Sequence, residues 1–167
     1  MNKSNVNMIA QGAIIAALYV VLTYVANLLG LASGVIQVRF SEALTILPYF
    51  TFAAVPGLTI GCLLANILTG GVIWDVIFGT VATLLGAVCT YILRNKKEFL
   101  APVPPIVSNT VIVPFVLKLA YGVPDAYPFL FFTVFAGELI SCGILGLILL
   151  YAVKPKKDVI FRTGENF

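Results

Sequence analysis

Histidine is absent from this 167-residue sequence, which removes the commonest metal ligand and the usual general base of enzymes. The phosphate-binding pattern G-x-x-x-x-G-K-[ST], the nucleophile pattern G-x-S-x-G and the zinc-binding pattern H-E-x-x-H are absent as well. We therefore expect neither an enzyme nor a cofactor or metal site. If the protein performs active transport, the energy must come from another subunit or from an ion gradient.

Charged residues are scarce, at 10% of the chain, whereas an ordinary soluble domain carries about 25%. Hydrophobic residues make up 60%, and the mean hydropathy is +1.06. The three cysteines, Cys62, Cys89 and Cys142, lie in apolar stretches without C-x-x-C spacing, so we expect them to be small buried apolar side chains. The composition predicts an all-α integral membrane protein in which residues 1–167 form a single transmembrane domain.

Six apolar segments can be marked along the chain. Several are shorter than the ~20 residues of a simple membrane span, so we expect some helices to be broken, tilted or partly in loops. Pro48 and Pro114 are candidate kinks. The predicted transmembrane helices cover approximately residues 8–31, 41–54, 57–69, 75–93, 102–121 and 128–153.

Basic residues predict the orientation of these helices. With six crossings, the basic clusters fall on one side of the membrane, whereas five crossings would separate them. The positive-inside rule then places both termini in the cytoplasm. We interpret the clusters as orientation signals rather than nucleic-acid contacts. Their members are Lys3, Arg94, Lys96, Lys97, Lys154, Lys156, Lys157 and Arg162.

Glu138 is the only charged residue in the apolar run over residues 128–153. It would lie roughly 15 Å along a helix that begins near Pro128, close to the middle of a membrane. A carboxylate there costs about 2.5 kcal/mol or more unless it faces a cavity or finds a partner. Lys118 could neutralise it across two helices, but a role in ligand or proton binding is favoured because buried membrane carboxylates are usually functional.

Other polar residues gather toward the outer side in this topology. Arg39 and Glu42 share a helix face, either as an interfacial ion pair or as a clamp that offers a ligand a guanidinium and a carboxylate. Asn66 approaches the outer end of the third predicted helix, whereas Asn109 lies deeper, in the inner half or near the middle of the fifth. Either could be a hydrogen-bonded staple between helices, or could read the polar edge of a heterocycle.

Trp74 and Asp75 open the fourth predicted helix. Tryptophan at this position is typical of the membrane interface, and a stacking platform is the weaker reading. Together with the preceding residues, these side chains predict a pocket that is loaded from the external face.

The first predicted helix carries small residues on adjacent stripes, namely Gly12 with Ala16 and Ala13 with Ala17. Such stripes allow another helix to approach closely, either within the same chain or from a partner. The residues alone leave both alternatives open.

Several motifs together resemble one family. They are residues 37–44 (QVRFSEAL) followed by Leu47 and Pro48, residues 61–66 (GCLLAN), residues 75–84 (DVIFGTVATL), residues 102–105 (PVPP), Asn109, and Gly137 with Glu138. This pattern is similar to the QueT family, the substrate-binding S-components of energy-coupling factor (ECF) transporters for queuosine precursors. The similarity extends from about Gly12 to Leu150.

The resemblance implies a six-helix S-component in a prokaryotic cell membrane that captures a 7-deazaguanine, such as 7-aminomethyl-7-deazaguanine, from outside. It also implies docking on a transmembrane coupling protein with two cytoplasmic ATPases, through the stripe of Gly12, Ala13, Ala16 and Ala17. We expect Glu42 and Glu138 to divide the recognition of the ligand's N–H donors and its cationic aminomethyl group. The supporting ligand contacts would be Arg39, Asn66, Asn109, Asp75, Trp74 and Lys118.

Two other hypotheses compete with this interpretation. One is a stand-alone secondary carrier for a small polar or cationic solute, with Glu138 as a proton or ion relay, although no convincing internal repeat supports it. The other is a structural membrane protein whose buried charges only connect helices. The sequence does not fix which precursor is preferred, which carboxylate contacts which ligand group, or the oligomeric state.

Overall fold

The computed structural model describes residues 3–32 and 36–161, and every regular element within these ranges is helical. The elements are α1 (Lys3–Leu28), η1 (Phe40–Tyr49), α2 (Ala54–Leu68), α3 (Ile73–Leu93), η2 (Glu98–Leu100), α4 (Val103–Leu119), α5 (Tyr127–Glu138), η3 (Leu139–Leu145), α6 (Gly146–Val153), η4 (Lys154–Lys156) and α7 (Lys157–Ile160).

Four helical stretches are long and apolar enough to cross a membrane: Asn5–Leu28, Ile73–Leu93, Glu98–Leu119 and Tyr127–Ile160. Helix α2 is a shorter apolar helix of 15 residues. Large apolar side chains are exposed along these helices, as expected where lipid rather than water surrounds them. The protein is therefore a multi-pass membrane protein.

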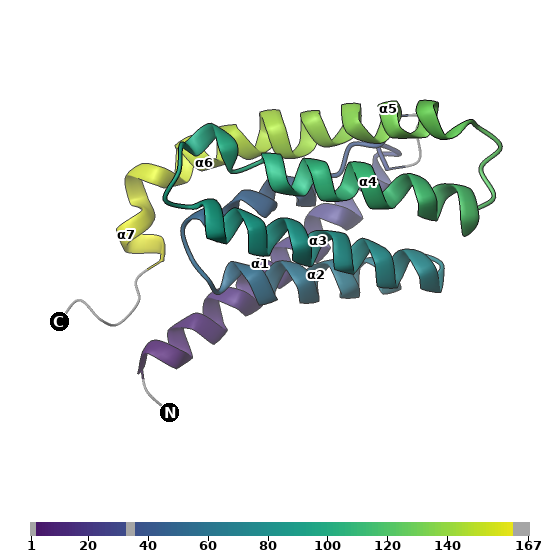
Figure 1. Ribbon diagram of the computed structural model, residues 1–167. Coiled ribbons are helices and arrows are strands. Elements are labelled where there is room, and N and C mark those ends of the chain that lie inside the picture. The colour runs from purple at the N-terminus through teal and green to yellow at the C-terminus, as the bar shows by residue number, and fades with distance from the viewer. Residues whose placement is uncertain (1–2, 33–35, 162–167) are drawn as a thin grey trace.

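In Figure 1, α3, α4 and the α5–α6 rod run roughly side by side, and α1 passes across the bundle at an angle. The first turn of α1 and the short helix α7 lie at the same end of the molecule, and the loop between α4 and α5 lies at the other. That this shared end of the molecule faces the cytoplasm, as the basic clusters indicate, remains a prediction.

The second predicted helix, over residues 41–54, differs most from the structure. Residues 40–49 form a 3₁₀ helix, and its buried residues run from Ser41 to Pro48 with one partly exposed alanine between them. Ten residues at about 2.0 Å each extend only ~20 Å, less than the ~30 Å hydrocarbon core of a bilayer. The segment is therefore shorter than predicted: η1 is a buried inner element that packs against α1, α3, α6 and η3, and its role as a membrane span remains a prediction.

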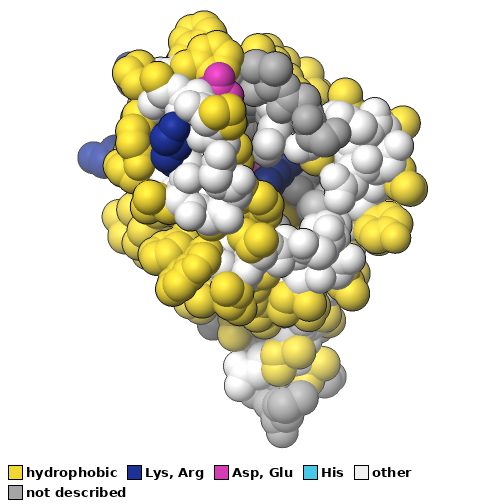
Figure 2. All heavy atoms as spheres, turned by 90° about the vertical axis from the view of Figure 1, so that its right-hand side faces the viewer, with side chains coloured by type: hydrophobic (Ala, Val, Ile, Leu, Met, Phe, Trp, Pro, Cys, Tyr) yellow, Lys and Arg dark blue, Asp and Glu magenta, His cyan; other side chains and the backbone are white. Residues whose placement is uncertain are grey.

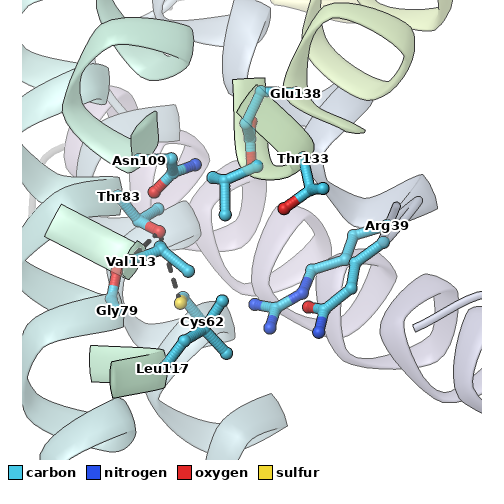
Figure 3. A pocket seen from close by; sticks show the side chains of 11 residues that line it. Arg39, Cys62, Gly79, Thr83, Asn109, Val113, Leu117, Thr133 and Glu138 are labelled. Atoms are coloured by element: carbon cyan, nitrogen blue, oxygen red, sulfur yellow. Dashed lines mark hydrogen bonds between the residues drawn. The ribbon is translucent and has the colours of Figure 1, made fainter. Parts of the chain in front are cut away.

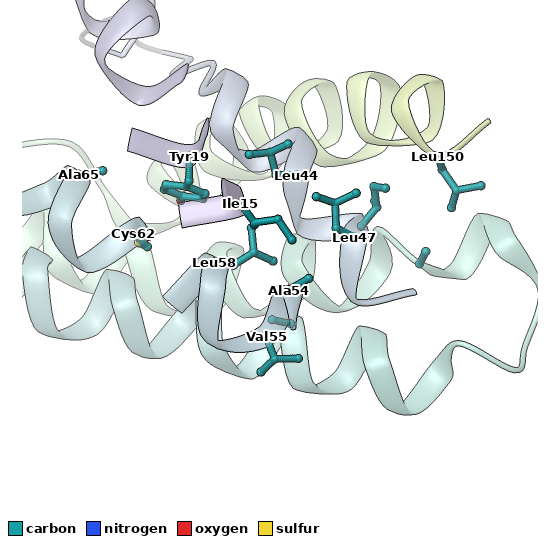
Figure 4. Packing of buried hydrophobic residues seen from close by; sticks show 13 residues of the cluster. Ile15, Tyr19, Leu44, Leu47, Ala54, Val55, Leu58, Cys62, Ala65 and Leu150 are labelled. Atoms are coloured by element: carbon teal, nitrogen blue, oxygen red, sulfur yellow. The ribbon is translucent and has the colours of Figure 1, made fainter. Parts of the chain in front are cut away.

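Helices α1 and α2 pack closely because small residues meet at their crossing. A Cβ atom added to Gly61 would lie 3.0 Å from the Cα of Ala16, and one added to Gly57 would lie 2.7 Å from the carbonyl oxygen of Gly12. The main apolar cluster continues from this crossing, with Ile15 beside Leu58 in Figure 4. Its residues also come from η1 and α6, so the core holds η1 in place.

Candidate functional site

Two connected cavities lie toward the end of the bundle that carries the α4–α5 loop. The inner one, of about 30 Å³, has room for one or two water molecules. The outer one, of about 420 Å³, is hereafter the vestibule. Figure 2 shows this end of the molecule with a basic side chain inside a hollow. The two cavities share Gln37, Arg39, Val113 and Leu117.

The inner cavity is built from five segments that are far apart in the sequence (Figure 3). Among its lining residues, Arg39 precedes η1, Cys62 comes from α2, Asn109 from α4 and Glu138 from the end of α5. The complete lining is Gln37, Arg39, Cys62, Gly79, Thr83, Asn109, Val113, Leu117, Thr133, Val134 and Glu138.

Glu42 lies on η1 directly behind this lining, with only 2% of its surface exposed. Its carboxylate accepts a hydrogen bond from the Tyr19 hydroxyl of α1. The Asn109 Nδ2 atom of α4 donates a second one, at 3.4 Å from Oε2. Glu42 is therefore held between two helices, and it touches the cavity through Asn109.

Glu138 faces the cavity directly, at the point where the helix changes its winding. The seven residues after it, Leu139–Leu145, form a π-helical segment, a feature that is frequent at functional sites. The Cys142 thiol donates to Glu138 Oε2 at 3.0 Å and lies 3.4 Å from the Thr45 hydroxyl. Polar atoms of Glu42, Glu138 and Cys142 all lie within 4.8 Å of one another.

A close backbone approach brings the segment before η1 against Glu138. A side chain at Gly137 would collide with the carbonyl oxygen of Gln37, so glycine is required there. The backbone N–H of Arg39 donates to the Ser141 hydroxyl at 3.1 Å. These contacts place the Arg39 and Gln37 side chains at the border between the inner cavity and the vestibule.

Neither carboxylate has a basic partner in residues 3–32 and 36–161: no ammonium or guanidinium nitrogen lies within 4.0 Å of Glu42 or Glu138. Lys118, the predicted partner of Glu138, instead donates to the backbone oxygens of Pro124 and Asp125 at 3.0 and 2.9 Å. The buried Glu42 and the partly buried Glu138 thus share one site, in which their hydrogen-bond partners are uncharged hydroxyl, amide and thiol donors.

The vestibule contains the remaining predicted polar residues of α2 and α3. Asn66 and Asp75 line it, and both are buried. The Tyr121 hydroxyl, from the loop after α4, donates to Asp75 Oδ2 at 3.0 Å and closes one wall. The structure therefore groups Asn66 and Asp75 in the outer cavity and Arg39, Asn109 and Glu138 around the inner one.

Two predicted ligand contacts lie outside both cavities. Trp74 is 55% exposed and stacks against Phe78 in a separate apolar groove between α3 and α4. Lys118 is bound to the α4–α5 loop, as described above. The lining residues of the inner cavity and vestibule in the described chain include neither of them.

Sequence reasoning missed several residues of the site. Gln37 lines the inner cavity and belongs to the QVRFSEAL motif, but it is not among the predicted ligand contacts. Its position two residues before Arg39 would have indicated that its amide reaches the same site. Tyr19 and Thr23 form a polar pair at i and i+4 in an otherwise apolar helix, and they contact Glu42 and Ser41. Cys142 lies one turn after Glu138, which the spacing could have revealed.

Glu42, Glu138 and Cys142 are also the residues of the described chain that could together hold a metal ion. Their hydrogen bonds, with Cys142 as a thiol donor to Glu138, satisfy the same atoms without one. That no metal binds here remains a prediction.

Comparison with known proteins gives the family. Residues 9–155 match the family described as QueT transporter. The curated protein "Queuosine precursor transporter QueT" of Lactococcus lactis subsp. cremoris (strain MG1363) is 41% identical over 86 residues. This alignment covers 51% of the present chain and 50% of the relative, so it spans about half of each protein. No solved structure matches the chain.

The family match covers the motifs that carry the resemblance described from the sequence, and it confirms that resemblance. It extends from the first turns of α1 to the end of α6, and so includes both cavities and the carboxylates of Glu42 and Glu138. The chain belongs to the QueT transporter family.

Proposed function

We propose that this protein is the substrate-binding S-component of an ECF-type importer and that it captures a queuosine precursor, a 7-deazaguanine such as 7-aminomethyl-7-deazaguanine, from outside the cell. One observation carries the proposal: the buried carboxylate of Glu42 and the partly buried one of Glu138, without a basic partner in the described chain, stand at the inner end of a cavity that opens through a vestibule. Membership in a transporter family and the name of the Lactococcus relative support it.

The ligand's chemistry complements these groups. A deazaguanine presents N–H donors and a carbonyl acceptor, and its aminomethyl substituent is cationic. Glu138 faces the cavity and is the acid that would contact the ligand, whereas Glu42 would act by fixing Asn109. Because Asn109 donates through Nδ2 to Glu42, its carbonyl oxygen is left to accept a ligand N–H. The Arg39 guanidinium is a donor for the ligand carbonyl.

The available volume indicates how the ligand would lie. The inner cavity of about 30 Å³ is far too small for a bicyclic base, because small-molecule sites usually measure about 300–1,000 Å³. The vestibule, at about 420 Å³, falls in that range. A ligand that reaches Glu138 would therefore extend into the vestibule and pass Arg39 and Gln37 at the border.

A groove on the outside of α1 and α2 supports the partner part of the proposal. It has a volume of about 610 Å³ and is lined by small and apolar side chains that include all four residues of the predicted stripe. Ala13 and Ala17 are exposed, whereas Ala16 is buried against Gly61. A helix of the coupling protein would contact Ala13 and Ala17, while Gly12 and Ala16 also serve the internal crossing. ATP would bind to the partner ATPases.

Calorimetric titration of the purified, detergent-solubilised chain tests the substrate. We expect tight binding of 7-aminomethyl-7-deazaguanine and no comparable binding of guanine or riboflavin. Absence of binding by every 7-deazaguanine would overturn the proposal. The alternative, a secondary carrier with Glu138 as a proton relay, predicts uptake into vesicles that lack the ATPase subunits, whereas an S-component requires them.

The Ala17→Leu variant tests the partner surface. A leucine there projects from the exposed stripe, so ATP-driven uptake by the assembled transporter should be lost while ligand binding by the isolated chain is unchanged. Ile14→Leu is the matched control, because Ile14 is 61% exposed on the same helix and is not among the groove residues. Full uptake by Ala17→Leu would place the coupling protein elsewhere.

A further inference from the structure

A third polar cavity lies at the end of the bundle opposite the vestibule. It has a volume of about 380 Å³ and forms where the end of η1, the turn after α3 and the carboxy-terminal arm of residues 154–161 meet. Its lining residues are Tyr49, Phe50, Arg94, Asn95, Glu98, Lys154, Lys157, Asp158 and Phe161. The transport function proposed above uses none of them.

Positive charge is concentrated around this cavity. Its lining contains three basic and two acidic side chains, a net charge of +1. Three further lysines, Lys96, Lys97 and Lys156, are close to it in the sequence but outside the lining. Glu98 is neutralised by Lys154, whose Nζ lies 2.5 Å from Oε1. Lys157 has no hydrogen-bond or ion-pair partner for its ammonium group within the described chain, so the cavity keeps an unneutralised cation.

Arg94, which lines the same cavity as Lys157, is held in a fixed position by Tyr91. Its guanidinium carbon lies 3.9 Å from the centre of the Tyr91 ring, and Nη1 donates to the Tyr91 carbonyl oxygen at 3.0 Å. These contacts use one face and one N–H of the guanidinium group, and its other N–H donors remain available for an acceptor that offers two oxygen atoms. A phosphate group has the geometry and charge that such a pair of cations binds.

The arm beside the cavity is apolar as well as basic. Phe161 stacks on Phe50, with ring centroids 5.5 Å apart and planes 10° from parallel. Val159 and Ile160 are 80% and 47% exposed. Basic residues next to exposed apolar residues at the end of a membrane-spanning bundle match a lipid, whose headgroup is anionic and whose chains are hydrocarbon.

We propose that this cavity binds the headgroup of an anionic phospholipid, with the phosphate between Arg94 and Lys157. Asp158 and Asn95 also line the cavity and would accept hydrogen bonds from headgroup hydroxyls, which favours a glycerol headgroup. The acyl chains would lie against Val159 and Ile160. Basic pockets near the ends of membrane helices are a recognised way in which proteins hold such lipids.

The test uses the full chain in detergent, titrated with phosphatidylglycerol and followed by native mass spectrometry of the bound lipid. The double variant Arg94→Gln/Lys157→Gln should bind it about tenfold more weakly, since each cation near an anionic lipid contributes substantially. The control variant Lys97→Gln/Lys156→Gln removes the same charge from the same end but outside the cavity lining, and should bind like the unaltered chain.

Equal weakening of lipid binding in both double variants would mean that only the general surface charge attracts the lipid, and would overturn the proposal of a specific site. Equal binding of phosphatidylcholine, or full displacement by millimolar inorganic phosphate, would exclude a site for an anionic lipid. The single variant Lys157→Gln changes an exposed side chain and leaves Arg94 on Tyr91, so a loss there cannot be attributed to misfolding. The melting temperature of each variant without lipid provides the folding control.

Discussion

The two ends of this molecule treat charge in opposite ways. At the end with α7, acidic and basic side chains lie on the surface, as in the pair formed by Lys154 and Glu98. At the other end the carboxylates of Glu42 and Glu138 are withdrawn into the bundle and meet donors that carry no formal charge. Surface charge orients and anchors a membrane protein at little energetic cost. A charged side chain inside the bundle without a counterion is costly, and such residues usually serve to bind a ligand or an ion.

The largest contrast is expected between two acids, one at each end. Glu138→Gln should weaken binding of 7-aminomethyl-7-deazaguanine by about 2 kcal/mol or more, roughly thirtyfold, because the cationic group loses a charged partner inside the cavity. The neutral nitrile analogue should lose less. Calorimetric titration measures both ligands.

Glu98→Gln is the matched control, since it makes the same change at the surface end and should leave both affinities unaltered. Equal losses for the two ligands with Glu138→Gln would assign this acid to the shared ring system instead. A loss with Glu98→Gln would contradict the separation of the two ends.

A smaller effect is expected from the support of Glu42. Tyr19→Phe removes the hydroxyl that donates to the Glu42 carboxylate and leaves a buried acceptor short of one partner, at a cost of about 1–3 kcal/mol. The melting temperature of the purified chain should fall, and ligand affinity should fall with it because Asn109 loses its fixed partner. Tyr24→Phe, on the same helix but half exposed, should change neither quantity. An unaltered melting temperature for Tyr19→Phe would show that the hydrogen bond from the Tyr19 hydroxyl to Glu42 does not stabilise the fold.

The smallest effect belongs to the surface pair. Lys154→Gln removes an ion pair whose side chains are 49% and 27% exposed, and exposed pairs contribute about 0–1 kcal/mol. The melting temperature should change little, and raising the salt concentration should produce the same small change in the unaltered chain. A fall as large as that of Tyr19→Phe would mean that this pair holds the carboxy-terminal arm in place.

Sequence reasoning located features that depend on local patterns. Six helical segments follow from apolar runs, and Glu138 stands out because no other charge shares its run. The structure has helices near five of the six expected ranges and a 3₁₀ helix in the remaining one, over residues 40–49. It also brings Arg39, Asn109 and Glu138 to one cavity. Whether these residues bind a ligand remains a prediction, as does the single transmembrane domain.

The features that escaped depend on partners distant in sequence. A stripe of small residues predicts that another helix approaches closely, but it does not identify that helix. Here Gly12 and Ala16 contact α2 of the same chain. Lys118 finds loop carbonyls six and seven residues away instead of the acid on the next helix. The segment 40–49 resembles a short span in hydropathy, but its Ser, Glu and Thr side chains are satisfied only by contacts from α1, α4 and η3.

The short length of η1 has a consequence for biogenesis. An apolar segment of ten residues cannot be handed to the bilayer as an independent span, so during synthesis it must wait at the membrane surface or beside α1. The Glu42 carboxylate meets Glu138 and Cys142 only after another 100 residues have been made and the last long helix has been inserted. In a chain that stops before α5, the polar side chains of η1 would therefore lack their partners from η3. Quality-control proteases could recognise such a chain and remove it.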